Sequence, residues 1–183
     1  MEKKSKKKDT VSQRKWLTII FFSTFLLSAL FNTLSTELVE NVNNIVISVI
    51  ILILFMSIGI GFDLVGTAVT AAEETPFHAM ASDKKKGAKE SLKLIKNADR
   101  VANVCSDVIG DICGVLTGAM GALIATNVAK MLGQKDITVT TLLVTATITA
   151  LTVWFKGLFK QVAIKNCNKI IEKIGRFLAI FSH

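Results

Sequence analysis

Long apolar blocks separated by short polar segments are the main pattern along the chain. Four blocks are each close to the roughly 20 residues that a helix needs to cross about 30 Å of hydrocarbon. Because open strands cannot span lipid, the pattern predicts an all-α membrane protein with four transmembrane helices. The predicted spans cover about residues 16–34, 45–67, 102–128 and 137–155.

The polar segments predict further elements. Residues 1–15 are polar and basic and predict a disordered cytoplasmic tail, and residues 16–183 form a single transmembrane domain. Between spans two and three, Thr75 before Pro76 is typical of a helix start. The basic stretch 84–96 then predicts a second short cytoplasmic helix.

Beyond the fourth span, apolar residues recur at helical spacing and basic residues fill the other positions. This pattern predicts a basic amphipathic belt helix over about residues 158–181, lying at the cytoplasmic interface.

Charge gives the orientation. The chain is 51% hydrophobic with a net charge of +8, and its mean hydropathy is +0.52. Nearly all Lys and Arg lie in the tail, in the segment between spans two and three, and in the belt helix. Three such segments on one side fit four spans with both termini cytoplasmic in the plasma membrane. The basic residues flank apolar blocks, so we expect contact with anionic lipids and no nucleic-acid binding.

Three carboxylates at membrane depth are the candidate metal ligands. Asp63 lies late in span two, and Asp107 and Asp111 lie early in span three. The latter two share a helix face and repel each other unless a cation or a basic side chain separates them. One interpretation is a site for Mg²⁺, which prefers oxygen ligands. The alternative is a structural pairing with Lys156 or Lys160.

A series of small residues accompanies these carboxylates. Gly110, Gly114 and Gly118 are spaced four apart, which allows two helices to approach closely in lipid. The partner helix belongs either to the same chain or to a second one. Because Asp107 and Asp111 lie beside this ridge, we expect them to face protein.

The remaining reactive residues form no catalytic pattern. Cys105, Cys113 and Cys167 are odd in number and lie in or beside apolar blocks, which favours free thiols. His78 lies in a polar stretch and is expected to be solvated. The sequence has no phosphate loop, nucleophile elbow or metalloprotease helix, so we predict that the protein is not an enzyme.

Four segments carry a resemblance to a known family. They are GTAVTAAEE (66–74), DKKKGAKESLKLIKNADR (83–100), VIGDICG (108–114) and FKGLFKQVAIKN (155–166). In this order they resemble the transmembrane domain of the CorB/CorC/CNNM magnesium and cobalt transport proteins, over about residues 45–180. The resemblance implies a homodimer and a site for a dehydrated magnesium ion, so Mg²⁺ is the candidate cofactor. It also leads us to expect that the family's soluble regulatory domains are missing.

The resemblance implies positions for the ion site. Asp63 stands near the first serine of the family's first motif, and Gly66 stands at its glutamate. Asp111 falls near the asparagine of the glycine-rich span. Lys156 stands where the family's third motif carries glutamate, and Phe159 replaces its proline. A lysine there puts positive charge where the ion would be.

Two functions from different classes follow. The first is a divergent, minimal member of the family that takes part in divalent cation transport or homeostasis. The alternative is a non-transporting membrane module of the same fold that dimerises with or regulates a transporter, with Lys156 neutralising Asp107 or Asp111. An unrelated small four-span membrane protein is the third interpretation.

Overall fold

The structure is a computed structural model that describes residues 16, 18–31, 33, 45–131 and 137–181. All regular structure in this part of the chain is helical. An apolar helix, Thr18–Phe31, comes first. The later elements are α2 (Ile45–Ala71), α3 (Glu74–Ser82), α4 (Ala88–Lys96), α5 (Ala98–Ala102), the π-helix η1 (Asn103–Gly110), α6 (Asp111–Met131), α7 (Ile137–Lys165) and α8 (Cys167–Phe181).

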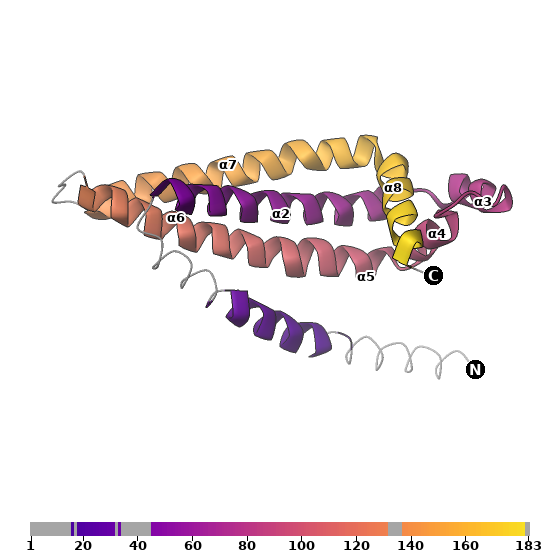
Figure 1. Cartoon of the computed structure of the whole chain (residues 1–183), viewed down its shortest axis with the longest axis horizontal. Coiled ribbons are helices and arrows are strands. Elements are labelled where there is room, and N and C mark those ends of the chain that lie inside the picture. The colour runs from indigo at the N-terminus through magenta and orange to yellow at the C-terminus, as the bar shows by residue number, and fades with distance from the viewer. Residues whose placement is uncertain (1–15, 17, 32, 34–44, 132–136, 182–183) are drawn as a thin grey trace, which may run out of the picture.

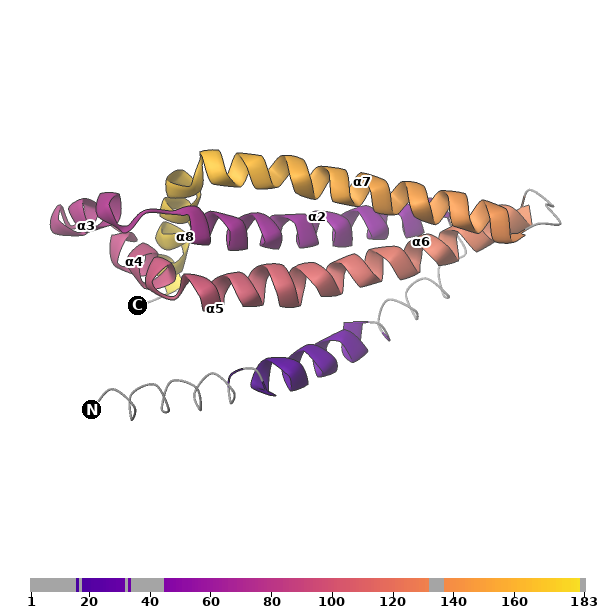
Figure 2. The same ribbon diagram turned by 180° about the vertical axis from the view of Figure 1, so that it is seen from behind.

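Three long rods lie side by side and form the body of the molecule (Figures 1 and 2). The first is α2, the second is the continuous series α5–η1–α6, and the third is α7. Among the described residues, these rods are the helices long and apolar enough to cross a membrane, as Ile45–Ala71, Ala98–Met131 and Thr138–Lys165. The prediction of an all-helical membrane fold is therefore confirmed for spans two to four.

The first predicted span is described as a shorter helix. Thr18–Phe31 is apolar but lacks the length of the three rods, and positions 17, 32 and 34 of the predicted span lie outside the described residues. The helix contacts the bundle near both of its ends. The guanidinium of Arg100 lies 5.3 Å from the centre of the Trp16 ring. The rings of Phe31 and Phe55 meet edge to face at 6.4 Å.

The end of the fourth predicted span differs from the observed helix end, because the first basic residue was taken as the boundary of the span. The basic residues that begin at Lys156 do not end α7, which continues to Lys165. The break comes at Asn166, whose side-chain amide donates to the carbonyl of Val162 at 3.2 Å. The amphipathic helix expected from about residue 158 therefore comprises Cys167–Phe181 in the structure.

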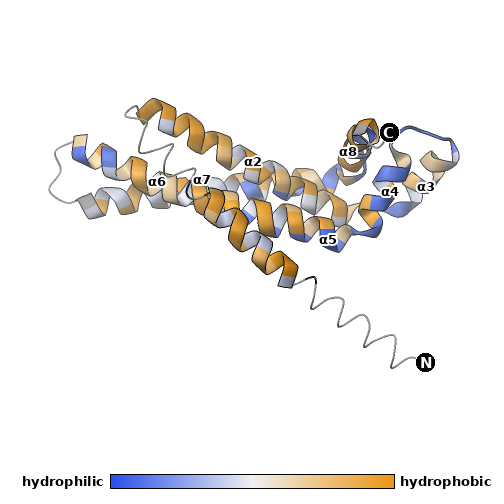
Figure 3. Cartoon of the chain, turned by 60° about the horizontal axis from the view of Figure 1, so that its bottom comes forward, coloured by the Kyte–Doolittle hydropathy of each residue, from blue (hydrophilic) through white to orange (hydrophobic). Residues whose placement is uncertain are grey.

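The helices α3, α4 and α8 lie together at one end of the rods (Figure 3). There α8 crosses the ends of the long helices and packs on α4 (Figure 1). One buried apolar cluster joins the rods to this end. Its members are Ala68, Val69, Phe77, Ile95, Ala163 and Ile171. Burial of these side chains fixes α3, α4 and α8 against the rods, because removing apolar surface from water is the main source of stability.

Candidate cation site at the crossing of α2 and η1

A π-helix interrupts the second rod. Residues Asn103–Gly110 form η1 between two α-helical segments. π-Helical turns are rare in proteins, and those that occur are often found at functional sites. Asp107 lies within η1 and Asp111 directly follows it, so two of the three predicted ligands belong to this interruption.

Glycines on α2 let the first rod approach η1 closely. A Cβ atom on Gly59 would lie only 2.8 Å from the Cβ of Cys113, and one on Gly66 would collide with Ser106. On η1, Gly110 faces α2, since a Cβ on Gly110 would lie 3.9 Å from the Cβ of Asp63. A packing role was not predicted from the sequence for Gly59 or Gly66. Their spacing of two helical turns, with Asp63 between them, was the available signal.

One side-chain hydrogen bond crosses this contact. The Ser106 hydroxyl donates to the backbone carbonyl of Asp63 at 3.5 Å, so it is a long bond. Asp63 is half-buried between the two rods. The Ser106 hydroxyl and the Asp63 carbonyl therefore meet where α2 meets η1, and the Asp63 Cβ lies at the same contact.

The third rod contributes a cation to the same place. The Nζ atom of Lys156 on α7 donates to the carbonyl oxygen of Gly110 at 3.5 Å. It also lies 4.0 Å from where a Cβ on Gly114 would be. A carbonyl oxygen has two lone pairs, so Gly110 can accept this bond beside a helical one. The site thus brings together groups from all three rods, with an ammonium group at a carbonyl oxygen.

The other two predicted ligands are solvent-exposed. Asp107 and Asp111 are exposed in the single chain, whereas the glycine ridge led us to expect them against protein. Within the described residues, the ion pairs are His78–Glu74 and Arg176–Glu172. Lys156 and Lys160 are therefore not ion-paired with Asp107 or Asp111 here.

The chemistry of the site follows from its donors. Among the described residues, no three His, Cys, Asp or Glu side chains come close enough together to hold a metal ion. Asp63, Asp107 and Asp111 thus do not form one three-carboxylate centre. The crossing offers instead one half-buried carboxylate, a hydroxyl and a backbone carbonyl, which are the oxygen types that hard cations prefer.

Comparison with known families decides the identity of the fold. The family model of the cyclin M (CNNM) transmembrane N-terminal domain matches residues 62–183. The chain belongs to this CNNM family. The CNNM family is associated with Mg²⁺ and Co²⁺ transport, and its transmembrane domain has no catalytic function. No curated protein and no solved structure matches the chain.

The CNNM match confirms the resemblance and covers every group at the crossing except Gly59. It begins at Phe62, so the helix Thr18–Phe31 and the first half of α2 precede it. Residues of α2 and α7 within the matched range both contact η1. Asp63 and Gly66 contact η1, and Lys156 reaches Gly110.

The glycine series of this CNNM domain divides into different roles. Gly110 is buried against α2, and Gly114 faces Lys156. A Cβ on Gly118 would meet no atom within 4 Å. Further along, Gly121 packs closely on Ile148 of α7, where a Cβ would lie 2.9 Å from the Ile148 Cδ1 atom. Close packing inside the chain therefore uses Gly110 of the series and Gly121 beyond it, and Gly118 has open space at its Cβ position.

Proposed function

We propose that this CNNM domain takes part in divalent cation transport or homeostasis, with magnesium or cobalt as the ion. The observation that carries the proposal is the meeting of α2, η1 and α7 at the Gly110 carbonyl. An ammonium group already binds there. An oxygen that accepts from an ammonium group in a membrane protein is also suited to a metal cation, because both carry positive charge.

A second function is favoured by the same contact. In a non-transporting module of this fold, Lys156 would hold the Gly110 oxygen permanently and repel a divalent ion. The lack of a three-ligand group among the described residues supports this alternative. Such a module would act by association with a second chain or with a transporter.

Substitution of Lys156 separates the two functions. At an effective dielectric of about 20, two unit charges about 4 Å apart interact by about 4 kcal/mol. Replacing the ammonium by a carboxylate removes that repulsion and adds a ligand. We therefore expect Lys156→Glu to strengthen Mg²⁺ binding at least about tenfold, which needs only about 1.4 kcal/mol. Lys156→Ala should mainly lower the thermal stability.

The measurement is calorimetric titration of the purified full chain with Mg²⁺, together with Mg²⁺ flux into proteoliposomes. Flux by the wild type supports transport. No flux by the wild type, with binding gained by Lys156→Glu, supports the non-transporting module. Lys160→Glu is the matched control, since Lys160 is exposed one turn further along α7, and it should change the affinity less than about twofold. Sub-millimolar binding that is equal in wild type and Lys156→Glu would place the ion elsewhere and overturn the assigned site.

A further inference from the structure

The contact between α4 and α8 has almost no space between the two backbones. A Cβ on Gly87 would lie 2.7 Å from the Arg176 Cα atom, and a Cβ on Gly175 would lie 2.6 Å from the Gly87 carbonyl oxygen. Gly87 also has a φ of 87°, a conformation that glycine adopts without strain. The two glycines therefore fix the turn before α4 directly against α8.

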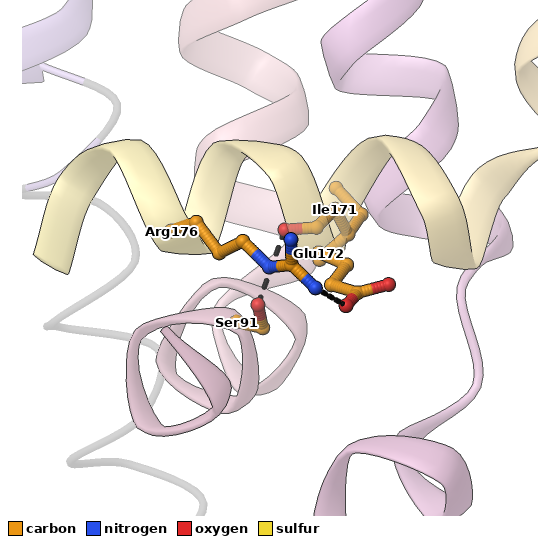
Figure 4. A network of polar contacts seen from close by, with 4 residues as sticks. All are labelled: Ser91, Ile171, Glu172 and Arg176. Atoms are coloured by element: carbon orange, nitrogen blue, oxygen red, sulfur yellow. Dashed lines mark hydrogen bonds and ion pairs between the residues drawn. The ribbon is translucent and has the colours of Figure 1, made fainter. Parts of the chain in front are cut away.

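A buried hydrogen bond sets the angle of this crossing. Ser91 is 1% exposed, and its hydroxyl donates to the carbonyl of Ile171 at 3.1 Å. Figure 4 shows this bond bridging the two helices, with the Arg176 side chain extending along α8 towards Glu172. The position of Arg176 relative to the turn before Gly87 is therefore set by packed backbone and a buried bond.

This crossing creates a basic hollow. Lys85 and Lys86 precede Gly87, and Arg176 follows Gly175, so the close glycine contact brings three cationic side chains together. Within the described part of the chain, a hollow of about 360 Å³ is lined by Lys85, Lys86, Arg176 and Ile180. Its volume is within the range of about 300–1,000 Å³ that is usual for ligand sites.

The charge of the hollow is only partly compensated. Arg176 is ion-paired with Glu172, and neither ion pair of the described residues includes a lysine. Lys85 and Lys86 are both exposed. A ligand that carries negative charge would therefore gain two lysine contacts without having to break an existing pair.

The hollow has exposed apolar residues at its wall, and these favour a lipid over a free anion as the ligand. Ile180 is 60% exposed, and so is Phe177 one turn earlier on α8. Both residues belong to α8, which lies at one end of the rods (Figure 3). An inorganic anion would gain nothing from an apolar wall, whereas the acyl chains of a phospholipid would.

We propose that the hollow between the turn before α4 and the helix α8 binds the phosphate headgroup of an anionic phospholipid. Lys85, Lys86 and Arg176 contact the phosphate, and Ile180 packs on the adjoining acyl chain. The bound lipid then joins α4 to α8 at the membrane surface.

Native mass spectrometry of the detergent-solubilised full chain tests this site. Titration with dioleoylphosphatidylglycerol should give one tightly bound lipid, and dioleoylphosphatidylcholine should bind at least about tenfold more weakly. Each lysine near an anionic lipid contributes about fivefold in affinity. We expect Lys85→Gln and Lys86→Gln to weaken binding by about that factor each, and the double variant by about twenty-five-fold.

The controls distinguish the hollow from general attraction. Lys93→Gln with Lys96→Gln removes the same charge from exposed positions of α4 and should change the affinity less than about twofold. Lys85→Arg with Lys86→Arg should keep wild-type binding. The site would be overturned if both double glutamine variants lost the same lipid affinity, or if the two lipids bound equally well. It would also be overturned if the double arginine variant lost lipid binding. Inorganic phosphate bound as tightly as the lipid would show an anion site without lipid and would also overturn the proposal.

Discussion

At the scale of single residues, the site depends on two glycines, because they have no side chain to hold the helices apart. Gly59 and Gly66 allow α2 to touch the second rod at Cys113 and Ser106, and this contact places Asp63 beside Gly110. Helix association in lipid relies on such close packing because no hydrophobic force acts between helices there.

Adding a single methyl group should therefore loosen the crossing. We expect Gly59→Ala to destabilise the protein by about 1–3 kcal/mol, because the new Cβ overlaps with Cys113. Gly61→Ala is the matched control, since Gly61 lies on the same helix with nothing within 4 Å of its Cβ position. That change should be neutral or stabilise by up to about 1 kcal/mol. Thermal unfolding in detergent measures both, and equal midpoints would show that the crossing is not tight.

The sequence indicated the candidate ligands but not which side of the helix each of them faces. Asp63, Asp107 and Asp111 could be found because charged residues inside apolar blocks are rare. Which of them meets α2 depends on the rotation of the second rod, and the π-helix changes that rotation before Asp111. The expectation that Asp107 and Asp111 face protein came from their place beside the glycine ridge and assumed a regular α-helix, whereas the structure has them exposed.

At the scale of elements, part of the small-residue ridge on the second rod makes no close contact within the described chain. Gly110 and Gly121 pack inside the chain, but Gly118 has open space at its Cβ position. Its surroundings leave room for a second helix. The homodimer implied by the family resemblance remains our proposal, and this is the position at which we expect the two copies to meet.

Substitution of Gly118 by a large residue tests that dimer. Gly118→Leu should convert the dimer to a monomer in cross-linking or light scattering, while the helix content and thermal midpoint of each chain stay close to wild type. Val115→Leu is the control, because Val115 is 59% exposed one turn earlier on the same rod. A Gly118→Leu protein that keeps the wild-type mass would exclude this part of α6 from the interface.

The helices themselves were largely predictable, and their ends were not. Long apolar blocks predicted four spans, and the last three of these are the rods, since length and hydrophobicity are local properties of the chain. The end of α7 was missed because charge begins at Lys156 while helical hydrogen bonding continues to Lys165. The start of α4 was also displaced. Lys84 has a φ of 54° and Gly87 has one of 87°, so the basic stretch opens with a turn.

At the scale of the whole molecule, most of the described basic residues lie towards one end. The turn from α2 to α3, the helix α4 and the helix α8 all lie at the same end of the rods (Figure 1). Arg100 and Trp16 are also in contact there. Because Lys and Arg are retained on the cytoplasmic side, we propose that this end is cytoplasmic and that the plasma membrane is the location.

Labelling from outside the cell tests this orientation. A cysteine introduced at Ser82 should stay unlabelled by a membrane-impermeant maleimide until the cells are opened. One introduced at Met131, which is 77% exposed at the other end, should be labelled in intact cells. The chain with its native cysteines provides the background. Labelling of position 82 in intact cells would contradict the proposed orientation.

The depth of Lys156 has an electrical consequence. After this residue α7 continues to Lys165, which is about 13 Å of helix at about 1.5 Å per residue, so the ammonium group is well inside the end of the rod. In the proposed orientation it lies within the transmembrane voltage drop, which is worth about 2.3 kcal/mol per charge per 100 mV for a full crossing. A negative interior pulls this charge towards the cytoplasm, and a divalent ion in its place would be pulled twice as strongly. Membrane voltage therefore acts directly on the group that binds Gly110.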